Sequence, residues 1–180
     1  TDAPMTSRTH PLDSFFAPSS IAIIGASRDA LKIPGLLLTF LRRNGFPGWI
    51  YPVNPNYPNI DGLACYPSVA DIKQPIDLAI VIIPARVVLD VLKECAVAGV
   101  KNAIIISSGF AEEGGDSAAI QDAIAGLART SGMRISGPNA EGFYNELGRV
   151  AATFSPTVDV KPDAPRLLAT QRRIGTVAQS

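Results

Sequence analysis

Continuous apolar runs alternate with segments of helical periodicity over most of the chain. Runs with little polar interruption predict strands buried on both faces; they lie at residues 20–24, 49–53, 78–83 and 102–107, with a brief fifth at 134–136. Apolar residues three or four apart predict helices between them, around residues 36–43, 87–98 and 117–131, and a short helix within 67–72. The pattern predicts an α/β domain of three layers, with helices on both faces of a parallel sheet.

In a sheet of this kind, ligands bind outside the carboxyl ends of the strands. The segments after the five predicted strands are small or polar; they lie at residues 25–27, 54–56, 84–86, 107–110 and 137–139. The first of them, Gly25-Ala26-Ser27, joins a buried strand to a helix that has Pro34 near its start and Gly45 after its end. Such a turn gathers backbone N–H groups at a helix N-terminus, which suits a phosphate.

Composition excludes several classes of partner. The 180 residues carry 16 basic and 16 acidic side chains, so no basic stripe favours nucleic acid. No apolar run is long enough to span a membrane, and no secretory signal opens the sequence. Cys65 and Cys95 lack the spacing of a redox or zinc motif. We therefore expect a cytoplasmic protein that binds neither nucleic acid nor membrane, with a buried thiol at Cys95.

The first turn does not fit a nicotinamide dinucleotide. That site needs a G-x-G-x-x-G turn and an acidic residue at the end of the second strand. Here a single glycine, Gly25, precedes Gly35, and the second strand ends in Val53-Asn54-Pro55 without a carboxylate. A nucleotide whose ribose carries its own phosphate prefers a cation at this place, as NADP and coenzyme A do.

Four cations lie near the turn. Arg28 and Lys32 lie within the loop and are candidates for ligand contact. Arg42 and Arg43 lie at the end of the predicted helix, where cations are favoured by the helix dipole without any ligand.

Catalytic groups are scarce. No serine lies in a nucleophile elbow, and no His or Cys cluster has metal-ligand spacing. Glu112 and Glu113 form a carboxylate pair in a loop, which solvation explains, and the only histidine, His10, lies in a tail rich in Pro, Ser and Thr. General acid–base catalysis therefore has no clear agent in this chain.

The pattern weakens at both ends. We expect a flexible arm at residues 1–14, a Rossmann-like domain at 15–150 and a linker at 151–173. Residues 174–180 then predict the first strand of a second domain.

Five segments in order resemble the N-terminal CoA-binding domain of NDP-forming acyl-CoA synthetases, a family related to the alpha subunit of succinyl-CoA synthetase. They are Gly25-Ala26-Ser27, Tyr51-Pro52-Val53-Asn54-Pro55, Ile83-Pro84-Ala85, the run from Ser107 to Glu112, and Ser136-Gly137-Pro138-Asn139. The order and spacing agree from about Phe15 to Ala178.

The resemblance implies that coenzyme A lies along the carboxyl ends of the strands. The implied contacts are Gly25, Ala26, Ser27, Arg28, Lys32, Val53, Asn54, Pro55, Asn56, Pro84, Ile106, Ser107, Ser108 and Asn139. Members of this family make an acyl-CoA from a carboxylic acid, CoA and ATP, through an acyl phosphate and a phosphohistidine. The resemblance places that histidine in a second, flavodoxin-like domain, whose first strand Val177-Ala178-Gln179-Ser180 resembles, and assigns ATP and Mg²⁺ to an ATP-grasp domain or subunit.

Two positions depart from the family pattern. Asn56 stands where the family usually has lysine, so Arg28 or Lys32 substitutes for that charge or affinity is weaker. Ala140 stands where the family has cysteine. Two other functions stay open: a CoA-binding regulatory module of a protein acetyltransferase fusion, and an NAD(P)-dependent oxidoreductase domain.

Overall fold

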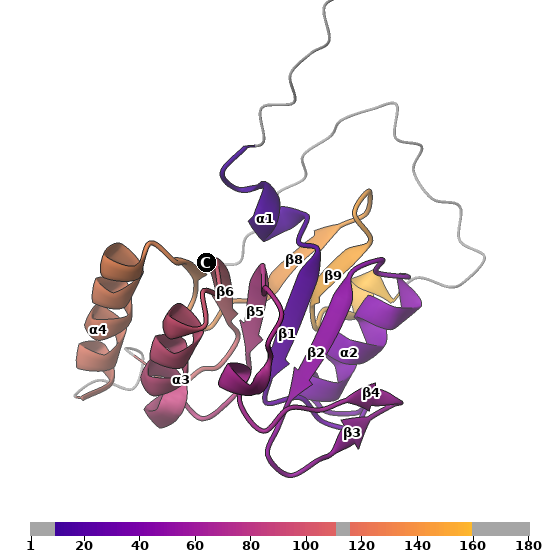
Figure 1. The fold of residues 1–180 in the computed structure, drawn as a ribbon, viewed down its shortest axis with the longest axis horizontal. Helices are drawn as coiled ribbons and strands as arrows, with labels where there is room; N and C mark the ends of the chain where they lie inside the picture. The colour runs from indigo at the N-terminus through magenta and orange to yellow at the C-terminus, as the bar shows by residue number, and fades with distance from the viewer. Residues whose placement is uncertain (1–9, 111–115, 160–180) are drawn as a thin grey trace, which may run out of the picture.

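A single parallel sheet forms the centre of the molecule (Figure 1). The computed structural model describes residues 10–110 and 116–159. The strands stand in the order β2-β1-β5-β6-β7, and every neighbouring pair is parallel. Their bounds are Ser20–Ile24 (β1), Trp49–Val53 (β2), Leu78–Val81 (β5), Asn102–Ile105 (β6) and Arg134–Ser136 (β7). The predicted Rossmann-like α/β architecture is confirmed.

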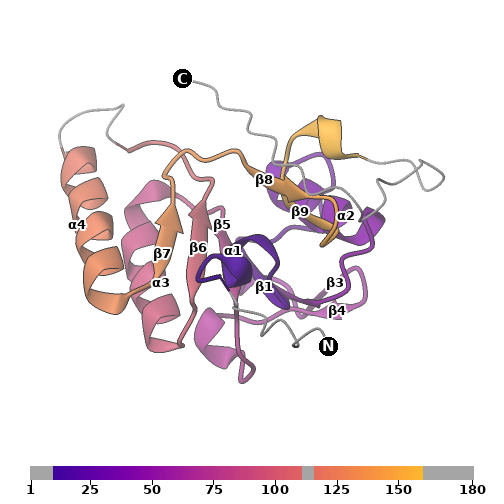
Figure 2. The same cartoon turned by 90° about the horizontal axis from the view of Figure 1, so that it is seen from above.

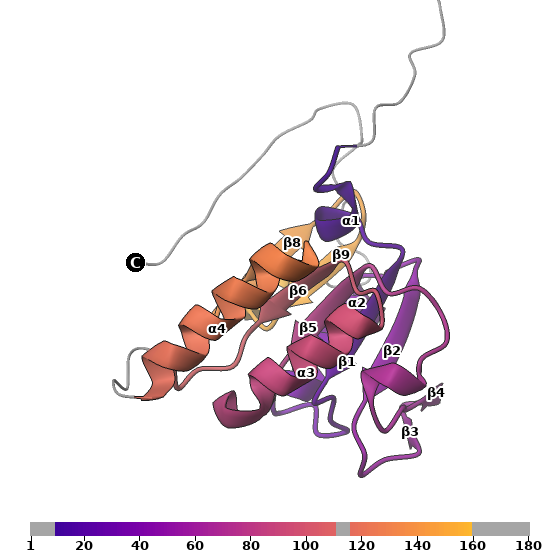
Figure 3. The ribbon, with the colours of Figure 1, turned by 60° about the vertical axis from the view of Figure 1, so that its left-hand side comes forward.

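Helices cover both faces of this sheet, as Figure 2 shows from above. On one face α2 (Ile33–Arg43) packs Leu37, Leu38 and Leu41 against Ile21 and Ile23 of β1. Successive strand residues point to opposite faces, so the alternate residues of β1 pack on the other side. On that other side lie α3 (Ala85–Val97) and α4 (Asp116–Ser131), which run side by side (Figure 3).

The order of the strands indicates where a sheet of this kind binds its ligand. The chain leaves β1 for β2 through α2 on one face, and leaves β5 for β6 through α3 on the other. The winding therefore reverses between β1 and β5. In doubly wound sheets ligands bind at this reversal, outside the carboxyl ends of the two strands.

The starts and caps of the helices largely follow the sequence prediction. Pro34 lies in the first turn of α2, and Ser68 caps a 3₁₀ turn, η1 (Val69–Asp71), in a capping box with Asp71. Strands β5 and β6 end two residues earlier than predicted. After β5, the Ile83 N–H donates to the Ser107 hydroxyl (3.0 Å) and not to the backbone of a neighbouring strand.

Two hairpins were not predicted. Strands β3 (Asn59–Ile60) and β4 (Leu63–Ala64) pair across a tight turn. Strands β8 (Gly142–Asn145) and β9 (Val150–Thr153) form a second antiparallel pair, in which β9 is wholly buried against α2.

The hairpin β8–β9 revises the expected end of the domain. The predicted linker at residues 151–173 begins inside β9, and Val158 is still buried beyond it, in a 3₁₀ turn at Pro156–Val158. The sequence pattern does not reveal β9, because the strand has only four residues and both of its faces are covered. Its side chains therefore do not alternate between apolar and polar. The rest of that linker, the predicted strand at 174–180, and Glu112 and Glu113 lie outside the described residues.

The predicted N-terminal arm contains the start of a short helix, α1 (Asp13–Phe16). The ring of Phe15 is buried, and Phe16 meets Phe143 of β8 edge-on at 5.2 Å. The Asn145 side-chain amide also donates to the Phe16 carbonyl (2.9 Å). None of the helices in the described ranges is long and apolar enough to cross a membrane.

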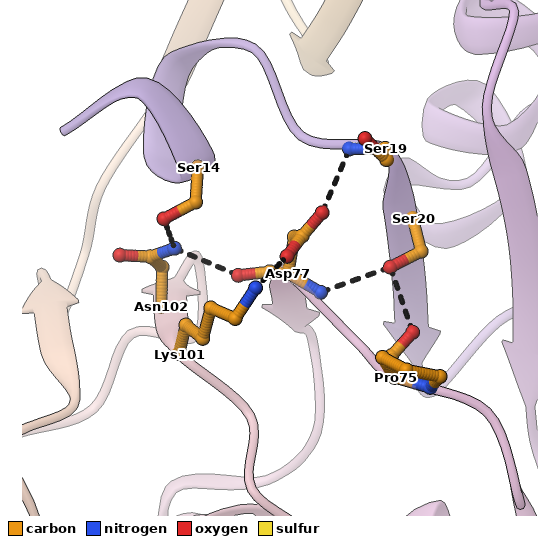
Figure 4. Close-up of polar contacts among 7 residues, drawn as sticks. All are labelled: Ser14, Ser19, Ser20, Pro75, Asp77, Lys101 and Asn102. Carbon is orange, nitrogen blue, oxygen red and sulfur yellow. Dashed lines mark hydrogen bonds and ion pairs between the residues drawn. The ribbon is translucent and has the colours of Figure 1, made fainter. Parts of the chain in front are cut away.

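The amino edge of the sheet is closed by polar side chains (Figure 4). Asp77 accepts from the Ser19 N–H (2.9 Å) and from the Lys101 ammonium (2.6 Å). Asn102 donates to the Ser14 hydroxyl (3.1 Å) and to the Asp77 carbonyl (2.8 Å), which ties α1 to the sheet.

Candidate functional site

The turn after β1 lies at the reversal between β1 and β5. Gly25 has φ of +92°, and a Cβ placed on it would lie 2.1 Å from the Ile82 carbonyl oxygen, so only glycine fits. The N–H groups of Gly25 and Ala26 both donate to the Val53 carbonyl, at 2.9 and 3.2 Å. These two donors therefore tie β1 to β2 and are not free for a phosphate, contrary to the simple turn-and-helix expectation.

Asn54 fixes the loop after β2. Its amide donates to the Ala26 carbonyl (2.8 Å), and its side-chain oxygen accepts from the Asn56 N–H (2.9 Å). The Cys65 thiol lies beneath and donates to the Asn54 carbonyl (3.5 Å). Burial raises the pKa of Cys65, which keeps this thiol protonated and able to donate. Asn54 thus joins the first two loops of the edge.

The two candidate cations of the first loop differ in what they touch. Arg28 donates from Nε and Nη2 to the Asn59 carbonyl, at 3.1 and 2.7 Å, and its guanidinium lies 4.9 Å from the centre of the Tyr57 ring. Lys32 instead pairs with Asp29 in its own loop, at 3.6 Å.

Arg42 and Arg43 lie in the last turn of α2, where the sequence predicts them. Arg42 donates to the Asp61 carbonyl (2.7 Å), and Arg43 forms an ion pair with Asp159 (2.8 Å). Both side chains act within the fold, away from the carboxyl edge.

The carboxyl ends of β5, β6 and β7 are joined through Ser107. Its hydroxyl accepts from the Ile83 N–H (3.0 Å), and its carbonyl accepts from the Asn139 N–H (3.0 Å). Asn139 follows the turn after β7 with φ of +54°. The predicted loops therefore do meet along one edge of the sheet.

The predicted contact residues divide by exposure. Four have buried side chains and can offer a ligand only backbone atoms: Ala26, Val53, Ile106 and Ser107. Gly25, Ser27 and Asn54 are half-buried. The exposed ones are Arg28, Lys32, Pro55, Asn56, Pro84, Ser108 and Asn139.

Sequence reasoning passed over one cation at this edge. Arg86 lies in the first turn of α3, two residues after Pro84, and is exposed. It follows one of the five expected strand ends, so its position alone is the signal that identifies it.

The described residues also form a cavity, but no group of metal ligands. A cavity of about 330 Å³ lies beneath α1, between Phe15, Phe16, Ile135 and Phe143, away from the carboxyl edge. Within residues 10–110 and 116–159, no three His, Cys, Asp or Glu side chains are grouped as metal ligands.

Comparison with known proteins identifies the family. The family model described as "CoA binding domain" matches residues 19–146. The chain belongs to this family of CoA-binding domains. It is 47% identical over 145 residues to an ADP-forming acetate–CoA ligase II of Archaeoglobus fulgidus. The matched region covers 80% of this chain and 21% of the ligase. It is 38% identical over 168 residues to the alpha subunit of ADP-forming acetate–CoA ligase I of Pyrococcus furiosus. That matched region covers 91% of this chain and 36% of the subunit.

The fold matches a solved synthetase. The dinucleotide forming acetyl-coenzyme A synthetase 1 of Ca. Korarchaeum cryptofilum, in complex with phosphate and ADP, superposes with a TM-score of 0.78 at 41% identity. The match covers 83% of this chain and 32% of the synthetase chain. The chain thus spans between about a fifth and about a third of the length of these three relatives. The predicted family resemblance is confirmed, while the acetyltransferase-fusion and oxidoreductase alternatives gain no support.

Proposed function

We propose that this chain binds coenzyme A along the carboxyl edge of its sheet, as part of an ADP-forming acyl-CoA synthetase. That enzyme would convert a carboxylic acid, CoA and ATP into acyl-CoA, ADP and phosphate. The observation that carries the proposal is the Gly25 turn, packed against Ile82 at the reversal of the sheet in a domain of the CoA-binding family.

The edge supplies two kinds of contact. Exposed cations, Arg28, Lys32 and Arg86, attract the phosphate groups of the cofactor. The buried residues Val53 and Ile106 would form the floor of the site. The Asn54 side chain and the Asn139 backbone N–H then shape the loops around the nucleotide.

The ATP-dependent steps belong, in this proposal, to parts other than residues 1–180. The sole histidine, His10, accepts a hydrogen bond from the Leu12 N–H at Nδ1 (3.2 Å), a local role at the start of α1. The phosphohistidine would therefore lie in a second, flavodoxin-like domain that begins within residues 174–180. ATP and Mg²⁺ would bind a separate ATP-grasp domain or subunit.

Calorimetry tests the proposal on the 180-residue chain. Coenzyme A and acetyl-CoA are expected to bind with similar affinity, because the shared nucleotide end makes the contacts. NAD⁺ is the control and is expected not to bind, since the loop after β2 has no carboxylate for its ribose. Absence of heat with CoA and acetyl-CoA, from a folded chain, would overturn the proposal.

A further inference from the structure

Arg28 carries its charge from one loop to another. Its backbone belongs to the loop between β1 and α2, but its guanidinium lies against Tyr57, in the segment between β2 and β3, and against Asn59, the first residue of β3. That segment also contains Asn56, which is neutral and exposed. The end of the second strand therefore carries a positive charge that its own residues do not provide.

The guanidinium is held with one edge unused. Nε and Nη2 donate to the Asn59 carbonyl, and Nη2 lies 3.3 Å from the Asn59 side-chain oxygen, while the Tyr57 ring covers one face. In the part of the chain that the structure describes, Nη1 has no hydrogen-bond partner, and the side chain is exposed. Because the fork is fixed before any ligand arrives, little rotamer entropy is lost on binding an anion.

The neighbouring cations are directed elsewhere. Lys32 pairs with Asp29, and Arg86 lies at the end of β5, across the reversal of the sheet. Arg42 donates to the Asp61 carbonyl in the β3–β4 turn. Of these four cations, Arg28 is the one whose guanidinium contacts the chain between β2 and the β3–β4 turn, at Tyr57 and Asn59.

Nucleotide-binding sheets place the ribose beside the end of the second strand and the diphosphate at the first turn. The unused Nη1 of Arg28 carries two N–H donors and belongs to a permanently charged guanidinium, which suits a phosphate monoester. We infer that Arg28 binds the 3′-phosphate on the adenosine ribose of coenzyme A and makes the site selective for CoA over dephospho-CoA. This inference rests on the proposed CoA function.

The test compares the affinities of the 180-residue chain for CoA and for dephospho-CoA, measured by calorimetry. The unaltered chain is expected to bind CoA roughly 10- to 100-fold more tightly. Arg28→Ala is expected to bring this ratio close to one by weakening CoA alone. Arg42→Ala removes the same side chain from a similar carbonyl contact in the β3–β4 turn, and is expected to leave the ratio unchanged. Tyr57→Leu is expected to lower the ratio in part, because the ring no longer orients the fork.

The outcomes separate the inference from the function beneath it. If the unaltered chain binds neither ligand, the proposed function fails. If it binds both equally, the function stands and the inference fails. If Arg28→Ala weakens both ligands by the same factor, Arg28 supports the loop or binds the diphosphate, and the inference is overturned. A collapse of the ratio in Lys32→Ala but not in Arg28→Ala would transfer the role to Lys32. Urea denaturation of each variant establishes that it is folded.

Discussion

The two edges of the sheet use polar residues in opposite ways. At the amino edge, the charged groups of Asp77 and Lys101 bond to each other, and Asp77 also bonds to the backbone of Ser19 (Figure 4). At the carboxyl edge, neutral groups such as Asn54 and Ser107 make the internal bonds. The Nη1 edge of Arg28 and the exposed side chain of Arg86 are left facing outward there.

This difference teaches how to separate structural from functional polarity. A charge whose bonding capacity is used inside the fold stabilises the fold, because a buried or half-buried group without its partner is costly. A charged side chain that is held in place by some of its hydrogen-bond donors, and has other donors unused, is ready to bind a ligand. We therefore expect substitutions at the amino edge to change stability alone, and those at the carboxyl edge to change binding as well.

The largest effect is expected at the Gly25 turn. Gly25→Ala would place a methyl group 2.1 Å from the Ile82 carbonyl oxygen, and should lower the free energy of unfolding by roughly 3 kcal/mol or more. Gly99→Ala is the matched control, because Gly99 also has positive φ (+77°) but has open space around it; its cost should be about 1–2 kcal/mol. Equal losses in urea denaturation would contradict the close packing at the reversal.

At the amino edge, Asp77→Ala removes the partner of Lys101 and of the Ser19 N–H. We expect a loss of about 2–3 kcal/mol in the free energy of unfolding. The CoA affinity should not change under conditions in which the variant is folded. Asp90→Ala breaks the exposed ion pair with Lys93 and should cost about 0.5 kcal/mol or less. A clear loss of CoA affinity in Asp77→Ala would show that the two edges are not independent.

The core between the edges gives a pH-dependent signal. Burial raises the pKa of the Cys95 thiol from about 9 to about 12. Above about pH 9 the thiol ionises in the unfolded chain but not in the folded one, so stability should fall by about 1.4 kcal/mol per pH unit until about pH 12. Chemical denaturation from pH 8 to 10 measures this, and Cys95→Ala should show a correspondingly smaller slope. An unchanged slope would mean that other groups cause the loss.

The smallest effect concerns two asparagines with the same bonding pattern. Asn54→Ala should cost about 1 kcal/mol of stability and, because it joins two loops of the site, lower CoA affinity about fivefold. Asn145 likewise donates to a carbonyl, that of Phe16, and accepts from a backbone N–H, that of Gly148. Asn145→Ala should cost similar stability and leave CoA affinity unchanged. A matching drop in affinity would show that the Asn54 effect is not local to the edge.

The sequence predicts the sheet well, because β1, β5 and β6 are buried on both faces and therefore read as continuous apolar runs. It predicts the end of α2 and the cap of η1 from single residues, Gly45 and Ser68. It misses β9, because four residues buried on both sides give neither a run of useful length nor an alternation.

The position of the site could be predicted from the sequence, but the contacts of its side chains could not. The five loops follow from the strand ends alone, and they do meet at one edge. What the sequence does not contain is direction: it does not say that Arg28 reaches across to Asn59, that Lys32 turns back to Asp29, or that the Gly25 N–H donates to Val53. These choices depend on distances between loops that are far apart in the chain.

The first helix of the domain is fastened to the hairpin near its carboxyl end. The ring of Phe16 in α1 meets Phe143 of β8 edge-on, and the Asn145 amide donates to the Phe16 carbonyl. Fraying from either terminus would therefore strip the cover from the same apolar patch, so the two ends should detach together rather than one after the other. Such a joint release would begin far from the crevice and leave the Gly25 turn in place until the sheet itself opens.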